Sequence, residues 1–377
     1  MAPNTTAQRR PQPKRHSRTL RQQRRYQIER FGSVSIQIIR LIICGLGAST
    51  IVGTTISIVN PPKSPVATNT EPPLPPLPQI EPLAPQVSSI KLHDRLQIAN
   101  TKHSKLLDAS YLFIDLDRGE YSEWGADRVL PAASTITLPI AIAAFEDIDN
   151  RKIDLSEKLT ITKSAISSGA GDLKDQKIGT QVSVLVAVTK MITINDNTAT
   201  NLLIDRLGGK FALNQRFRTW GLKATTIERP LPDLEGKNVT TARELTRSMM
   251  AIQRGKIISA ASRSRILSMM SNPTFNTMLP SGLTPGTKIA HKSGDIGAIV
   301  ADVGAIELSS GKKYLATVLV KRPYNDPTAP ELVRQMSEIA AEYFQTSTPK
   351  PTPVYPSKPQ PKSAAEFPNT IFIKPKT

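Results

Sequence analysis

The pattern of apolar and polar residues predicts a domain of mixed helices and strands over residues 88–345. Apolar runs bounded by turn residues predict strands in a hairpin over residues 109–126 and in two neighbouring segments, 299–308 and 312–322. Helical spacing or continuous apolar character predicts helices over residues 88–107, 183–192, 241–255 and 327–345. Strands thus lie near both ends and helices fill the middle. This order predicts an α+β fold, in which both ends of the domain complete an antiparallel sheet and an all-helical subdomain is inserted.

An uncharged stretch, residues 41–59, predicts a single transmembrane anchor. As a helix rising about 1.5 Å per residue, it matches the roughly 30 Å hydrocarbon layer of a bilayer. Basic residues precede it and prolines follow, so the positive-inside rule places the N-terminus in the cytoplasm. The anchor would then lie in the cell (inner) membrane, and the domain would be periplasmic or extracellular. A cleaved signal peptide and a buried core helix are the alternatives. The long basic arm and the proline-rich flank favour an uncleaved anchor.

The formal net charge of +18 is concentrated outside the predicted domain. Residues 1–40 are rich in arginine and contain one acid, Glu29, which is typical of a disordered, solvated arm. Residues 60–87 form a proline-rich linker, and residues 346–377 form a disordered tail rich in proline and lysine. Weak contact of this tail with an anionic envelope polymer or lipid is the alternative. The basic arm lacks interleaved aromatic residues, so we predict no nucleic-acid partner.

Cysteine and histidine usage predicts neither a disulfide nor a metal site. Cys44 is the single cysteine, so no intramolecular disulfide can form. The histidines show no spacing of the H-E-x-x-H kind. We therefore predict no metal and no cofactor. The histidines are His16, His93, His103 and His291.

Four segments follow one another in the order expected of one enzyme family: LPAASTITLPIAIAAFEDI, MITINDNTATNLLIDRLGG, NVTTARELTRSMM and IAHKSGDIGAIVADVGAI. They resemble the signature regions of class A serine β-lactamases and the related penicillin-binding serine hydrolases, whose motifs include S-x-x-K, S-D-N and K-T-G. The resemblance covers most of residues 88–345. It implies a β-lactamase/transpeptidase-like fold, because four weak motifs in order make a strong signal.

By this resemblance, Ser134 matches the nucleophile. A serine at a helix N-terminus suits that role, since the helix dipole and backbone N–H groups stabilise developing negative charge. From the residues alone, Ser134 could instead be an ordinary helix cap. Thr137 replaces the S-x-x-K lysine on the same helix face. A threonine hydroxyl is no base near neutral pH, and loss of a positioned base costs on the order of 10²–10⁴ in rate.

The S-D-N motif is matched by Asn195, Asp196 and Asn197. Asn195 replaces a serine that relays a proton in the family, and an amide cannot relay a proton in that way. The resemblance gives Asp196 a structural role and Asn197 the role of bonding a substrate amide. A plain helix N-cap turn is the alternative for any one of these residues.

The K-T-G motif is matched by Lys292, Ser293 and Gly294. The resemblance implies an edge strand that lines the site, where Lys292 attracts a substrate carboxylate and Gly294 permits close backbone approach. Lys292 is also a candidate for the missing base. A surface strand that happens to carry a lysine is the alternative.

The glutamate that activates the deacylating water in class A enzymes has no clear match. The stretch TTIERPLPDLEGK offers Glu228, Asp233 and Glu235, and none of them lies in the family's pattern. Glu228 and Arg229 could equally form a structural ion pair. Penicillin-binding members work without this glutamate, so its absence argues against fast β-lactam hydrolysis and not against the fold.

These observations predict a membrane-anchored, extracytoplasmic serine hydrolase domain. Its predicted targets are β-lactams or peptidoglycan-like D-Ala-D-Ala peptides, which acylate Ser134 slowly. The alternative is a catalytically degenerate family member that holds a cell-wall peptide or serves as a structural module without turnover. The two hypotheses differ in whether Ser134 forms a covalent adduct.

Overall fold

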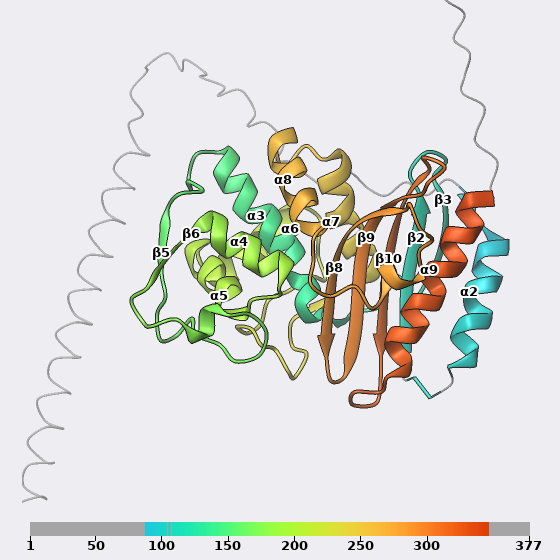
Figure 1. Cartoon of the computed structure of the whole chain (residues 1–377), viewed down its shortest axis with the longest axis horizontal. Coiled ribbons are helices and arrows are strands. Elements are labelled where there is room, and N and C mark those ends of the chain that lie inside the picture. Colours follow the sequence, from blue (N-terminus) through green and yellow to red (C-terminus); the bar gives the residue numbers. More distant parts are fainter. Residues whose placement is uncertain (1–86, 104, 107, 347–377) are drawn as a thin grey trace, which may run out of the picture. The chain divides into compact units, whose positions relative to one another are not determined.

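The structure, a computed structural model, describes residues 87–103, 105–106 and 108–346. Its main sheet has the strand order β1-β3-β2-β10-β9-β8 (Figure 1). The strands are β1 (Val87–Ser88), β2 (Asp108–Asp115), β3 (Glu120–Trp124), β8 (Lys288–Ile296), β9 (Ile299–Glu307) and β10 (Lys313–Lys321). The early and late strands meet where β2 pairs antiparallel with β10. The predicted α+β class is therefore confirmed, with a parallel β1–β3 pair as the one departure from antiparallel pairing in this sheet.

Helices lie on both faces of this sheet (Figure 1). Helices α2 (Ile90–Lys102) and α9 (Thr328–Thr346) pack on one face. The other face carries the inserted helical part of the chain, which contains α3 (Thr137–Asp149), α4 (Val184–Thr193), α5 (Asn197–Arg206), α6 (Gly209–Thr219), α7 (Ala242–Arg254) and α8 (Ala260–Met270). Short elements complete it: η1 (Ala133–Ile136), η2 (Leu173–Asp175), and the strand pairs β4 (Leu130–Pro131) with β7 (Val239–Thr240) and β5 (Lys158–Thr160) with β6 (Gln181–Ser183). The short η3 (Leu279–Gly282) lies on the opposite face, where it packs against α9.

Side chains alternate between the two faces of the sheet along each strand, so the buried residues form two separate cores. Tyr111 and Phe113 of β2 pack in the core under α2 and α9, whereas Leu112 and Ile114 pack in the core shared with the inserted helices. Successive residues of a strand project to opposite faces, so one strand serves both cores. The two outer helices are also tied directly, because the Ser89 hydroxyl donates to the Tyr343 hydroxyl over 2.7 Å.

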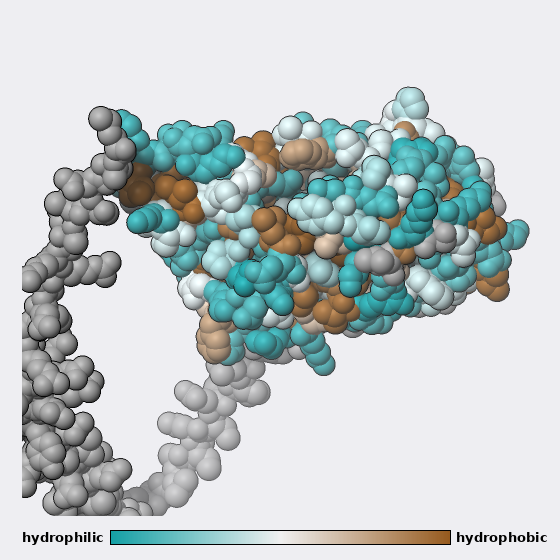
Figure 2. Space-filling model, turned by 90° about the horizontal axis from the view of Figure 1, so that it is seen from below, coloured by the Kyte–Doolittle hydropathy of each residue, from teal (hydrophilic) through white to brown (hydrophobic). Residues whose placement is uncertain are grey.

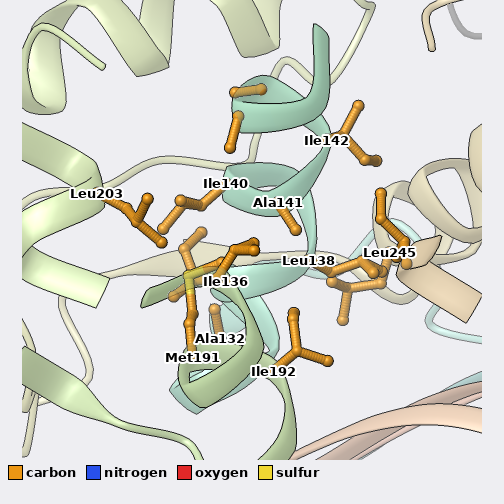
Figure 3. Packing of buried hydrophobic residues seen from close by; sticks show 14 of the residues in the cluster. Ala132, Ile136, Leu138, Ile140, Ala141, Ile142, Met191, Ile192, Leu203 and Leu245 are labelled. Carbon is orange, nitrogen blue, oxygen red and sulfur yellow. The ribbon is translucent and has the colours of Figure 1, made fainter. Parts of the chain in front are cut away.

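Helix α3 runs through the larger core and is buried on nearly every side. In Figure 3, Ile140 of α3 faces Leu203 of α5, while Leu138 lies beside Leu245 of α7. Burial of a leucine or isoleucine side chain contributes about 1.5–3 kcal/mol. The N-terminal end of α3 is consequently held by dense packing from several helices.

The helices predicted from the sequence are present as α2, α4, α7 and α9. Their starts follow local capping, because the hydroxyl groups of Ser89, Ser183 and Thr241 each accept the N–H of the third residue that follows. Helix α7 ends before Gly255, as predicted. The large apolar side chains that remain exposed come from different elements, and on the face in Figure 2 apolar residues are dispersed among hydrophilic ones.

The predicted arm (1–40) and anchor (41–59) lie outside the described residues, as do nearly all of the linker (60–87) and the tail (346–377). In the part of the chain that the structure describes, no helix combines the length and apolar character needed to cross a bilayer.

Candidate active site

Ser134 lies in η1, the turn of 3₁₀ helix that leads directly into α3. The N-cap positions of η1 and α3 are held by Ala132 and Ile136, so Ser134 is not a helix cap. Ser134 is half-buried between two buried neighbours. The preceding residue, Ala133, has a φ of +47°, a conformation that costs a non-glycine residue roughly 1–3 kcal/mol. The chain thus holds Ser134 in a strained turn at the positive end of a buried helix.

Strand β8 passes directly against this turn. It is the last strand of the sheet, so its outer edge pairs with no further strand of that sheet. A Cβ atom on Gly294 would lie 2.6 Å from the Ser134 backbone nitrogen and 2.9 Å from the Ala133 Cβ. Only glycine fits at this point. The predicted close approach of Gly294 therefore brings the β8 backbone beside Ser134.

Lys292 lies two residues earlier on the same face of β8, and its side chain is buried. Its Nζ donates to Asn195 Oδ1 and, over 2.9 Å, to the carbonyl of the neighbouring, buried Ser293. Burial lowers the pKa of Lys292 to about 7, against the opposing charge of Asp302. Near neutral pH, a large fraction of Lys292 is consequently an uncharged amine, which can accept a proton.

The turn between α4 and α5 carries the three predicted S-D-N positions. Asn195 has a φ of +56°, which asparagine tolerates better than most residues, and it bonds Lys292. The buried Asp196 caps α5 by accepting the Ala199 N–H over 2.8 Å, and it also accepts two N–H groups from the preceding loop. Asn197 donates to the Ser168 carbonyl over 2.9 Å. The structural role predicted for Asp196 agrees with these bonds.

Thr137 is buried and its hydroxyl donates to the Ser134 carbonyl over 2.7 Å. The hydroxyl is therefore used by the backbone of the same turn. It supplies no base at this position, in agreement with its chemistry.

The three acidic residues considered for the deacylating role, Glu228, Asp233 and Glu235, each bond to another group of the protein. Glu228 is exposed and pairs with Lys210 at 3.3 Å, while Glu235 pairs with Arg229 at 2.5 Å. The suggested Glu228–Arg229 ion pair is therefore wrong, because the side chain of Arg229 reaches forward to Glu235 across the loop. Asp233 is buried and accepts the Asn238 N–H over 2.6 Å.

A different part of this loop is bonded to helix α5. The side-chain amide of Asn201 in α5 bonds both the N–H and the carbonyl of Leu231, over 2.9 Å and 2.8 Å. The sequence did not predict this pair of hydrogen bonds. Its one signal was that Asn201 follows Asn197 by four residues, which places both amides on one face of a helix.

No group of three or more His, Cys, Asp or Glu side chains in the described ranges is arranged to hold a metal ion. The site residues found together are hydroxyl, amine and amide groups. Such a set can bind a carbonyl compound, attack it and move its proton.

The buried amine leads to a prediction about stability. In the unfolded chain, Lys292 would titrate near its ordinary pKa of 10.5, whereas the folded protein holds it at about 7. Between these values the unfolded state binds more protons, so the free energy of unfolding should rise with pH, by up to about 1.4 kcal/mol per unit. Lys292→Met should remove this contribution. Urea unfolding at several pH values measures it, and the exposed Lys163→Met is the control. Equal pH slopes in the two variants would contradict the assignment.

Comparison with known proteins agrees with this geometry. A family model described as "Beta-lactamase enzyme family" matches residues 91–344. Beta-lactamase BRO-1 of Moraxella catarrhalis is 26% identical over 267 residues, which cover 68% of this chain and 83% of that relative. The structure of PBP-A is 44% identical with a TM-score of 0.68, and the match covers 69% of this chain and 98% of PBP-A.

Two further solved structures extend the comparison. A mutant of PBP-A, 43% identical to this chain with a TM-score of 0.68, was solved as an acyl-enzyme complex with penicillin G; the match covers 69% of this chain and 98% of that one. An ancestral class A β-lactamase is 23% identical with a TM-score of 0.63, and the match covers 67% of this chain and all of the ancestral protein. At that identity, the second likeness concerns the fold alone.

Proposed function

Because the chain belongs to the β-lactamase enzyme family, we propose that it is a serine hydrolase that β-lactams or peptidoglycan-like D-Ala-D-Ala peptides acylate at Ser134. One observation carries the proposal. Ser134 lies at the N-terminal end of a buried helix, against Gly294 of the β8 edge and near the buried Lys292. The acyl-enzyme complex of the PBP-A mutant with penicillin G supports the choice of a β-lactam as the first ligand to test.

In the proposed acylation step, Ser134 is the nucleophile and Lys292 is the base. The Ser134 oxygen bonds to the substrate carbonyl carbon while its proton passes to the Lys292 amine. The oxyanion that forms lies at the positive end of α3, where helix N–H groups stabilise negative charge. When the C–N bond of the lactam breaks, the Lys292 ammonium returns a proton to the nitrogen. The products are an acyl-Ser134 ester and an opened ring.

Deacylation is the slower half of the proposed reaction. A water molecule needs a base to attack the ester, and the carboxylates of Glu228 and Glu235 are engaged in ion pairs at exposed positions of the loop. Asp233 is buried with one oxygen bonded to a backbone N–H. We therefore propose that the acyl-Ser134 ester is long-lived. A β-lactam would then inactivate the protein and be hydrolysed only slowly.

The location of this activity is part of the proposal. The uncharged stretch 41–59 anchors the chain in the cell membrane, with the N-terminus in the cytoplasm and the domain, residues 88–345, outside. Peptidoglycan-like peptides belong to the same compartment.

A second candidate is a binding module without turnover. It is favoured by Thr137, whose hydroxyl is bonded to the backbone, and by Asn195, which cannot relay a proton. In that case the chain would hold a cell-wall peptide while Ser134 stays unmodified. The two candidates predict opposite results in a single experiment.

That experiment is intact-mass analysis of the full-length chain after incubation with benzylpenicillin. We expect the mass to rise by one molecule of penicillin, and Ser134→Ala to prevent the rise. The control is Thr135→Ala, which removes the hydroxyl of a buried neighbour. If the adduct still forms in this variant, its loss in Ser134→Ala is specific to the Ser134 hydroxyl. An unmodified wild-type protein after long incubation would support the binding module instead.

A further inference from the structure

A cavity of about 310 Å³ lies between the sheet and the C-terminal ends of α7 and α8. It is at the beginning of β8, the end of that strand opposite to Gly294. Ala290 of β8 and Ala305 of β9 are directly opposite each other across the strand pair, and both line the cavity. These two small side chains leave the space between the sheet and Leu267 of α8 unfilled. The proposed mechanism does not use this cavity.

The charged residues around the cavity are paired with one another. Lys288 and Lys313 each lie 3.4 Å from a carboxylate oxygen of Glu307. The other residues that line the cavity carry no charge, and most of them are apolar. An occupant with apolar side chains therefore fits this site better than an anion does.

The neighbouring edge of the sheet can accept another strand. Strand β8 is the last strand of the main sheet, so its outer edge pairs with no further strand of that sheet. An unpaired strand edge offers backbone N–H and C=O groups to which an extended peptide can bond. Alternate side chains of such a peptide would point to the face of the sheet on which Ala290 lies.

The chain leaves the domain at this end of the sheet. The rings of Phe344, near the end of α9, and Tyr314, at the beginning of β10, have centroids 4.7 Å apart. Lys313, which lines the cavity, is the residue before Tyr314. The C-terminal end of α9 and the beginning of β8 thus lie at the same end of the sheet (Figure 1). The chain beyond Thr346 therefore begins close to the cavity.

One segment of the tail has the sequence of a strand with apolar side chains. The tail is rich in proline and lysine, but it contains the run Ile-Phe-Ile at residues 371–373. Proline residues lie on both sides of this run, so residues 369–374 all keep a backbone N–H. β-Branched and aromatic residues favour an extended strand. Because side chains alternate along a strand, the two isoleucines would share one face of it.

We propose that residues 369–374 dock on the outer edge of β8 as an added strand and place Ile371 and Ile373 in the cavity. The occupant is the tail of the same chain. The inference goes beyond the proposed function and does not rest on the acylation of Ser134. It assigns a folded position to a short part of a tail whose composition otherwise predicts disorder.

The length of the tail permits this docking. Ile371 follows Thr346 by 25 residues, which at about 3.3 Å per residue can span roughly 80 Å. A flexible connection gives the docking segment an effective concentration on the order of 1 mM. Even a weak contact is therefore occupied, and the tail of the same chain has an advantage over a free apolar peptide.

The docked segment would act on the strand that carries the candidate base. Ala290 precedes Lys292 by two residues and lies on the same face of β8. Gly294 follows on that face, beside Ser134. Pairing along the outer edge of β8 would restrain the strand and so stabilise the positions of Lys292 and Gly294.

Hydrogen exchange of the full-length chain, measured by mass spectrometry without any β-lactam, tests the inference. We expect the amides of residues 369–374 to exchange at least tenfold more slowly than their intrinsic rates. Ile371→Asp combined with Ile373→Asp should abolish this protection and should accelerate exchange in residues 288–291. The control is Val354→Asp, the same substitution at another apolar residue of the tail, which should leave the protection unchanged. A wild-type tail that exchanges at its intrinsic rate would overturn the proposal.

The position of the docked segment is tested from the domain side. Ala305→Leu should fill the cavity from β9 and release the tail, so that residues 369–374 lose their protection. Ala212→Leu, at a half-buried alanine of α6, is the matched control. Thermal unfolding establishes that both variants are folded.

Two outcomes of these measurements would contradict the proposal. A protected tail in a folded Ala305→Leu variant would show that the tail does not occupy this cavity. Protection that decreases on dilution of the wild-type protein would mean that the tail of a second copy is the occupant, which refutes docking within one chain.

Discussion

Restoring the two altered motifs, by Thr137→Lys together with Asn195→Ser, should accelerate acylation of Ser134 by benzylpenicillin on the order of 10²–10⁴-fold. The gain is expected because Thr137 lies three residues after Ser134, so a lysine there reaches the nucleophile from the same face of the helix. The serine hydroxyl introduced in place of Asn195 would accept from Lys292, as the Asn195 amide now does, and would also relay a proton to the leaving nitrogen.

The rate is measured by stopping the reaction at intervals and quantifying the adduct by intact mass. Thr219→Lys is the matched control, because it adds the same charge at an exposed position of α6. Thr137 is buried, so thermal unfolding must first establish that the double variant is folded. A folded double variant that reacts no faster than the parent would mean that proton transfer does not limit the reaction.

The second large effect is a loss. Gly294→Ala should slow acylation by about 100-fold or more, because the added Cβ would lie 2.6 Å from the Ser134 nitrogen. Either β8 or η1 must move, and η1 leads into a helix that is buried on nearly every side. Displacement of a reacting group by about 1 Å is enough to cost on the order of 10² in rate.

The control for this variant is Gly179→Ala, at a glycine whose added Cβ would meet open space. Gly179 has a φ of +91°, so that substitution carries a backbone cost without touching the site. Acylation should stay near the parent rate in Gly179→Ala. Similar rates for Gly294→Ala and the parent protein would show that the strand and the nucleophile are not in the proposed contact during the reaction.

The sequence allowed the fold to be predicted, because the local patterns and the resemblance agree on the order of its elements, whereas the roles of the candidate site residues stay predictions. Motif residues such as Ser134 and Gly294 lie on elements whose order along the chain follows the resemblance. The helix starts also depend on residues a few positions away, as at Ser183. The parallel β1–β3 pair was not predictable, since β1 has two residues and no pattern of its own.

Features that depend on side-chain rotation, on the path of a loop or on distant partners could not be predicted. The Thr137 hydroxyl bonds to the backbone of its own turn and not to a substrate. Which of the two it faces depends on the rotation of the side chain. The pairing of Arg229 with Glu235 depends on how the loop folds back. The contacts of His291 join β8 to β9 and to the loop before η3, and the sequence shows only a histidine beside a lysine.

The bond between Ser89 and Tyr343 has a mechanical consequence. The first and last helices of the described chain lie side by side, and both pack on the face of the sheet opposite the inserted helices (Figure 1). A pulling force applied to the two ends of this segment would first load α2, α9 and the β1–β3 pair. Ser134 and Lys292 lie outside that line of force. A force on the two ends of the described segment should therefore leave the geometry of Ser134 and Lys292 unchanged.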